Sequence, residues 1–212
     1  MGPEIRHVRP SEFDRVGDLV VNAYAAMFDL GEYEDELRRV EHRSRHAEVI
    51  VAMLDGSVAG TLTYVPGLGP YAEGDDPDAA WIRMLAVAPE FRGRGIGAAL
   101  VEWCVRRARE SGRQRIVLHT TDPMTDAQRM YIRLGFSRPP ISTGSRMKSS
   151  GCAATGWSWT APPDESGPAA VADDASANVG GPAALEHEPH GQDDQGDGEF
   201  HMPRIAVPVP NR

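Results

Sequence analysis

Residues 85–100 (LAVAPEFRGRGIGAAL) combine the residue types that suit an anion-binding site. An apolar run, typical of a buried strand, is followed by three glycines and then by apolar residues at helical spacing. Backbone N–H groups at the start of a helix that follows a glycine turn point toward an anion, and nearby arginines add positive charge. The stretch therefore predicts a phosphate site where a strand passes into a helix. The residues expected to form it are Arg92, Gly93, Arg94, Gly95, Ile96 and Gly97.

The spacing within this loop distinguishes between kinds of phosphate ligand. A Walker A loop needs a Gly-Lys-Ser/Thr sequence, and the loop has no lysine. A dinucleotide fingerprint is formally met by Gly93, Gly95 and Ala98, but no acidic residue ends the next expected strand, where a ribose would need it. The order Arg92-x-x-Gly95-x-Gly97 directly after a strand resembles motif A of the GNAT superfamily of N-acetyltransferases. The resemblance implies a loop that holds the pyrophosphate of acetyl-CoA, used as co-substrate, and implies no metal.

A second motif, residues 126–136 (DAQRMYIRLGF), lies about 35 residues downstream. Its apolar residues fall on one helical face, and Gly135 is a natural residue to end the helix. It is similar to the C-terminal signature of the same family, which implies that Tyr131 lies near the acetyl-CoA sulfur and protonates the departing thiolate. A tyrosine packed in the core is the alternative. Many family members carry an asparagine where this chain has Met124.

The family resemblance also implies direct transfer of the acetyl group to an amine. It implies that backbone groups of Leu85, Ala86 and Val87 hold the pantetheine and the thioester oxygen of the cofactor. The usual glutamate base of the family corresponds to Trp81 here. Other base candidates are His119, at the end of a strand, and the acidic residues of the loop 66–80; a structural histidine and a solvated loop are the alternatives. The candidate acceptor-site residues are Tyr71, Glu73, Asp75, Asp76, Trp81 and His119.

The surrounding sequence predicts elements in the order of this family. We expect an α/β (α+β) fold with three layers, in which helices flank a central, mixed and mostly antiparallel sheet. Asp55-Gly56 predicts a type I′ hairpin turn. The expected strands are 5–8, 48–54, 57–65, 80–87 and 114–120, and the expected helices are 13–27, 32–45, 97–110 and 126–134.

The composition indicates which cellular compartment and which classes of partner suit the protein. Two cysteines give no disulfide framework, which favours a reducing cytoplasm, and Cys104 is expected to be a buried structural thiol. A net charge of −9 argues against nucleic-acid binding, and no apolar run is long enough for a membrane span. The oligomeric state is left open.

The C-terminal part differs from the rest. Residues 150–212 carry a net charge of −8, and the first 149 residues carry −1. We therefore predict an acetyltransferase domain over 1–138 and a low-complexity, acidic, disordered tail over 139–212. Because regrouped codons of residues 140–160 permit two strand-like segments, we advance the hypothesis that the tail is a frameshifted translation. The final strands are then expected to be missing or altered, which would leave a strand edge exposed.

The function predicted from these observations is acetyl transfer from acetyl-CoA to a primary amine of a small molecule or peptide. One alternative is a non-catalytic acyl-CoA-binding module, because Trp81 replaces the usual glutamate. Another is an inactive, damaged copy of an acetyltransferase, and a third is an interaction protein whose acidic tail binds basic partners.

Overall fold

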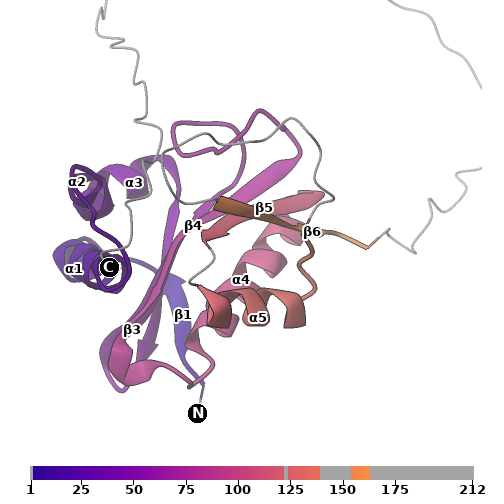
Figure 1. Ribbon diagram of the computed structural model, residues 1–212. Coiled ribbons are helices and arrows are strands. Elements are labelled where there is room, and N and C mark those ends of the chain that lie inside the picture. Colours follow the sequence, from indigo (N-terminus) through magenta and orange to yellow (C-terminus); the bar gives the residue numbers. More distant parts are fainter. Residues whose placement is uncertain (1, 122–123, 139–153, 163–212) are drawn as a thin grey trace, which may run out of the picture. The chain divides into compact units, whose positions relative to one another are not determined.

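The computed structural model describes residues 2–121, 124–138 and 154–162, and within them six strands form one sheet in chain order (Figure 1). Neighbouring strands are antiparallel except β4 and β5, which are parallel. The strands are β1 (Glu4–His7), β2 (Glu48–Leu54), β3 (Ser57–Val65), β4 (Ala79–Val87), β5 (Arg115–Thr121) and β6 (Ala154–Thr160).

Helices cover both faces of the sheet and bury two separate apolar clusters (Figure 1). On one face, α1 packs on β3 and β4, and α3 packs on β2, with α2 against α1. On the other face, α4 packs across β2, β3 and β4, and α5 packs against α4. The expected three-layer fold with a mixed sheet is confirmed. The helices are α1 (Phe13–Ala25), α2 (Tyr33–Arg38), α3 (Val40–His46), α4 (Ile96–Glu110) and α5 (Thr125–Arg133).

The tight hairpin between β2 and β3 forms where the sequence predicted it. Asp55 and Gly56 have φ angles of 53° and 76°, and Leu54 pairs directly with Ser57. Positive φ at both central residues is the geometry of a type I′ turn, which matches the twist of the two strands.

The single helix expected over 32–45 is instead two short helices, α2 and α3. The chain breaks at Arg39, whose ψ of 51° lies outside the helical range. The buried guanidinium of Arg43 donates to the carbonyls of Glu36 and Leu37, at 2.8 and 2.9 Å, and so satisfies carbonyls at the end of α2. Leu37 is fully buried beneath this break. The periodicity predicted helical structure there but not the break.

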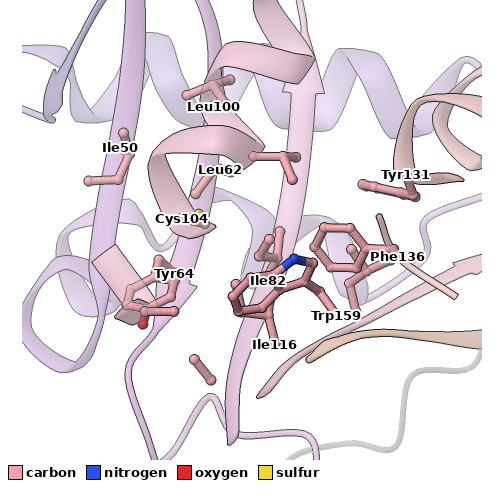
Figure 2. Packing of buried hydrophobic residues seen from close by; sticks show 14 of the residues in the cluster. Ile50, Leu62, Tyr64, Ile82, Leu100, Cys104, Ile116, Tyr131, Phe136 and Trp159 are labelled. Atoms are coloured by element: carbon pink, nitrogen blue, oxygen red, sulfur yellow. The ribbon is translucent and has the colours of Figure 1, made fainter. Parts of the chain in front are cut away.

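The sheet continues beyond residue 138 with the strand β6, so the strand edge that was expected to be exposed at β5 is covered. Seven residues of β6 pair with β5, and the side chains of Trp157 and Trp159 are buried. Trp157 Nε1 donates to Thr120 Oγ1 at 3.1 Å. Figure 2 shows Trp159 and Phe136 beside Ile82 and Ile116 in the core. The expectation failed because GWSWT is too short to read as an alternating strand, although two tryptophans two positions apart suffice to cover the core.

The domain boundary at residue 138 stays a prediction, and β6 extends the same sheet past that residue. Residues 139–153 and 163–212 lie outside the described residues, and so does most of the predicted acidic tail. The frameshift hypothesis stays a prediction. Resequencing the gene from an independent isolate tests it, and an unchanged reading frame through residue 212 would contradict it.

Candidate active site

The glycine loop predicted to bind phosphate is a left-handed turn that leads directly into α4. A short 3-10 turn (Pro89–Phe91) follows β4, and Gly93 and Gly95 have φ angles of 74° and 77°. Gly95 is the N-cap of α4, and a Cβ at either glycine would meet no other atom within 4 Å. Backbone conformation rather than crowding therefore requires glycine at these two positions. The turn leaves the first N–H groups of a 15-residue helix facing outward.

A pocket of about 790 Å³ opens beside this loop. Its walls come from the end of α1, the end of β4, the loop and α5. It contains the positive side chains of Arg92, Arg129 and Arg133. Eight of the nine residues predicted to bind the cofactor line it; Arg94 does not, and its guanidinium instead lies 3.3 Å from Asp55 and over the ring of Phe91. The sequence reasoning did not single out Arg129 and Arg133, although they stand one turn apart on the second motif's helix.

Strands β4 and β5 separate next to this pocket. Their parallel pairing runs only as far as Ile82 opposite Leu118. Beyond that point β4 stays paired with β3, where the register shifts between Thr61 and Thr63 and Met84 adopts a φ of 54°. Along residues 85–87 the edge of β4 that faces β5 has no strand partner among the residues that the structure describes. Its N–H and C=O groups can therefore bind an extended ligand as a strand would.

Two side chains at the point of separation are joined by one buried carboxylate. Arg83 and His119 each come directly after the last residue at which β4 and β5 pair with each other, and Glu73 comes from the loop between β3 and β4. Glu73 Oε1 lies 3.0 Å from Arg83 Nε, and Glu73 Oε2 lies 2.6 Å from His119 Nδ1. The side chains of Glu73 and Arg83 are 10% and 5% exposed, and that of His119 is 27% exposed. We call these three residues the buried triad.

The electrostatics of the buried triad keep Glu73 ionised. Burial by itself would raise the pKa of this carboxyl, but the hydrogen bond from His119 and the charge of Arg83 outweigh it and hold the pKa below its ordinary value. A carboxylate only accepts hydrogen bonds, so the proton on His119 lies on Nδ1 and points to Glu73. The Nε2 atom is then the one that can take a proton. It lies near Gly156 on β6, which has no side chain to cover it.

The other predicted acceptor-site residues divide into two groups. Tyr71 lies against the buried triad, with Arg83 5.9 Å from the centre of its ring and its hydroxyl 2.6 Å from His42 Nδ1. Trp81 is buried in the same apolar cluster as Tyr71. Asp75 is exposed, and Asp76 forms an ion pair with Arg115. The structure thus brings Tyr71, Glu73 and His119 together with Arg83, which the sequence reasoning missed. A lone arginine inside the apolar run AAWIRMLAV was its signal.

Tyr131 is buried against Phe136 and Trp157, with ring centres 5.7 and 6.3 Å away. It is not among the residues that line the 790 Å³ pocket. Burial, with a smaller contribution from Cys104, raises the pKa of its hydroxyl, so the group stays protonated. Tyr24 lines the pocket, and burial raises the pKa of its hydroxyl, which lies close enough to Arg83 and Glu73 for their charges to affect it.

Two further classes of site were searched for in the described part of the chain. No group of three or more metal-ligating side chains occurs there. No helix in these residues is long and apolar enough to cross a membrane. Cys104 is fully buried on α4, and burial raises the pKa of its thiol, which confirms the expectation of a structural cysteine.

A model of the Acetyltransferase (GNAT) family matches residues 14–136, which is more than half of the chain. The chain belongs to the GNAT acetyltransferase family. This match confirms the resemblance carried by the two motifs. Acetyl-CoA-dependent acetyl transfer is the reaction of this family, and the glycine loop, the unpaired edge of β4 and the pocket arginines fit that co-substrate.

Individual relatives agree with this assignment. The chain is 47% identical over 75 residues to a mycothiol acetyltransferase of Acidothermus cellulolyticus, covering 34% of this chain and 22% of that protein. It is 25% identical over 138 residues to an aminoalkylphosphonate N-acetyltransferase of Salmonella typhimurium, covering 64% and 85%. The chain thus spans about a fifth of the first relative and most of the second.

Solved structures share the fold of this GNAT domain. A GNAT-family acetyltransferase from Desulfovibrio desulfuricans superposes with a TM-score of 0.59 at 23% identity, covering 74% of this chain and 98% of that one. An acetyltransferase from Salmonella typhimurium, solved with its cofactor acetyl-CoA, gives 0.57 at 18% identity, covering 78% and 99%.

Proposed function

We propose that this protein transfers an acetyl group from acetyl-CoA to a primary amine by direct attack of the amine on the thioester. One observation carries the proposal: the buried triad lies where β4 and β5 separate, next to the backbone edge and pocket that suit acetyl-CoA. A proton acceptor and a cofactor site thus meet at one place.

The pocket residues hold the co-substrate in this proposal. N–H groups of the glycine loop and the start of α4 bind the pyrophosphate, and Arg92, Arg129 and Arg133 neutralise its charge. Backbone groups of residues 85–87 bind the pantetheine arm and place the thioester carbonyl. Backbone N–H groups fixed in this way stabilise negative charge that develops on the oxygen during attack.

His119 is the general base in this proposal, and Glu73 positions it. As the amine nitrogen forms its bond to the carbonyl carbon, its proton passes to His119 Nε2, directly or through one water. Glu73 accepts the hydrogen bond from Nδ1 and stabilises the imidazolium that results. Trp81 occupies the family's usual base position, so a base from β5 supplies the missing function.

Tyr131 is the general acid in this proposal. Collapse of the tetrahedral intermediate breaks the carbon–sulfur bond, and the departing thiolate takes the hydroxyl proton of Tyr131. Burial raises the pKa of this hydroxyl, so the group carries the proton that a donor must have before the step.

The remaining acceptor-site residues shape the approach of the amine. Tyr71 and Trp81 form an apolar wall beside the buried triad. Asp75 and Asp76, at the outer end of the same loop, attract a protonated amine toward the site.

Two assays on the full chain test this proposal. Titration with acetyl-CoA, followed by thermal unfolding, should raise the melting temperature in a saturable way. CoA release should then require an amine from a panel of diamines, amino acids, aminoalkylphosphonates and peptides with a free N-terminus. Acetyl-CoA binding without CoA release for any amine would favour the non-catalytic acyl-CoA-binding alternative.

A further inference from the structure

Within the part of the chain that the structure describes, the buried guanidinium of Arg83 faces a protein partner with only one of its nitrogen atoms. A buried guanidinium is costly unless its donors have partners, and this side chain is 5% exposed. Its Nε faces Glu73, but no hydrogen bond among the described residues uses its Nη1 or Nη2 group. Neither Nη atom is among the fully buried polar atoms that lack a hydrogen-bond partner. Both therefore keep some accessible surface, in line with the 5% exposure of the side chain.

The second buried arginine, Arg43, provides a contrast. Its Nη1 donates to two backbone carbonyls at the end of α2, which is a structural use. Arg83 has no such contacts with the backbone. Its surroundings are instead side chains that suit a ligand: the ring of Tyr71 and the hydroxyl groups of Tyr24 and Tyr33, which are near enough to influence its charge.

The free Nη groups of Arg83 define the ligand that fits. A guanidinium donates to oxyanions such as a carboxylate or a phosphonate, and Glu73 faces only its Nε. Because Glu73 joins Arg83 to His119, an acid group on Arg83 would place a nearby amine beside the proposed base.

We propose that the Nη groups of Arg83 bind a carboxylate or phosphonate of the acceptor, so that the acceptor is a small amino acid or an aminoalkylphosphonate. The inference rests on the proposed function, because it concerns the amine acceptor of the same site. A planar guanidinium pairs with both oxygens of such a group, which fixes the orientation of the molecule as well as its position.

Turnover with matched acceptors tests the inference in the full chain. Glycine, β-alanine and aminoethylphosphonate are compared with the neutral glycinamide, β-alaninamide and ethanolamine. The wild type should favour at least one acid over its neutral counterpart by tenfold or more in kcat/KM, through a lower KM. Arg83→Gln should abolish that preference, Arg83→Lys should keep part of it, and the KM for acetyl-CoA should not change. Neutral acceptors used as well as the acids by the wild type would overturn the inference.

Arg107→Gln is the matched control, because Arg107 Nε lies 2.9 Å from Glu48 in a surface pair of the same kind. The control should keep the full preference for the acid. An equal loss for acid and neutral acceptors in Arg83→Gln would contradict acceptor binding and show that Arg83 only positions Glu73. Melting temperatures with acetyl-CoA establish that each variant is folded.

A binding measurement separates this inference from the proposed function. In the presence of CoA, an acid from the panel should raise the melting temperature of the wild type and leave that of Arg83→Gln unchanged. If this pattern holds while no amine is acetylated, the proposed function fails and the anion site stands. No protection by any of the three acids would overturn the anion site, even if a neutral amine is acetylated.

Discussion

Two arginine–glutamate–histidine groups in this molecule have the same chemistry and different surroundings. In the buried triad, Glu73 joins Arg83 and His119 at 3.0 and 2.6 Å. In a second group, which we call the surface triad, Glu48 joins Arg107 and His7 at 2.9 and 3.0 Å. Arg107 is 40% exposed and His7 is 63% exposed, whereas the corresponding side chains of the buried triad are 5% and 27% exposed.

The difference shows that location, rather than residue type, gives the buried triad its proposed role. Water screens the charges of the surface triad, so its ion pairs contribute little beyond local packing. The buried triad lies at the separation of β4 and β5, where the same pairs are poorly screened and adjoin the cofactor pocket. The surface triad therefore supplies a matched control for each member of the buried one.

The largest difference is expected for the two histidines. His119→Gln removes the proposed base and should lower kcat by about 10²- to 10⁴-fold. His7→Gln removes the surface counterpart and should leave kcat unchanged. Steady-state CoA release by both variants measures this, and acetyl-CoA affinity should stay at the wild-type value in each. Equal rates in the two variants would rule out His119 as the base.

The next largest effect is expected at Tyr131, the proposed acid. Tyr131→Phe keeps the ring packing on Phe136 and should lower kcat by about 100-fold with little change in melting temperature. Tyr64→Phe is its control, because Tyr64 is also a buried tyrosine and its hydroxyl has no role in the proposed reaction. A wild-type kcat in Tyr131→Phe would show that another group, such as water, protonates the thiolate.

Glu73 and Glu48 should differ in how much each contributes to the stability of the folded protein, and in how that contribution depends on pH. Because the folded-state pKa of Glu73 is below its ordinary value of 4.5, its ionised form stabilises the protein above that value, and the contribution is lost as pH falls through the folded-state pKa. Glu73→Gln should cost about 2 kcal/mol at neutral pH and flatten the decline in stability below pH 4.5. Glu48→Gln should cost less than about 1 kcal/mol. Urea unfolding at several pH values measures both, and equal costs would contradict the distinction between the triads.

The smallest effect is expected on acetyl-CoA affinity, for glycines at the two ends of α4. Gly95→Ala forces a side chain into a left-handed conformation next to the pocket and should weaken acetyl-CoA binding about tenfold. Gly112→Ala introduces the same kind of strain, at a φ of 68°, after the opposite end of α4. Titration calorimetry should find wild-type affinity in this control. Equal affinity in both variants would mean that the loop does not hold the co-substrate.

The glycine loop and the pocket beside it were predictable because this part of the candidate site is local in sequence. The glycine turn, the strand before it and the helix after it are contiguous, so eight of nine predicted residues line the pocket. The central strands and the hairpin at Asp55 were predictable for the same reason. The break between α2 and α3 depends on Arg43, which bonds to carbonyls of an earlier segment, and no local pattern encodes that.

The acceptor side was predictable only as a set of candidates. Glu73, Arg83 and His119 come from a loop and two strands, and only the folded sheet brings them together. Local sequence could not separate Glu73 from Asp75, which is exposed in the same loop. It also could not give a role to Arg83, because the burial of that arginine depends on tertiary packing. β6 was missed because its two tryptophans contribute through burial rather than through a long alternating pattern.

The kcat of His119→Gln, of Glu73→Gln and of the double variant most directly tests whether the buried triad supplies the base. His119→Gln should lose the contribution of the base, and adding Glu73→Gln should lower kcat little further, because Glu73 acts through His119. His7→Gln should keep the wild-type kcat. A wild-type kcat in His119→Gln would contradict the account.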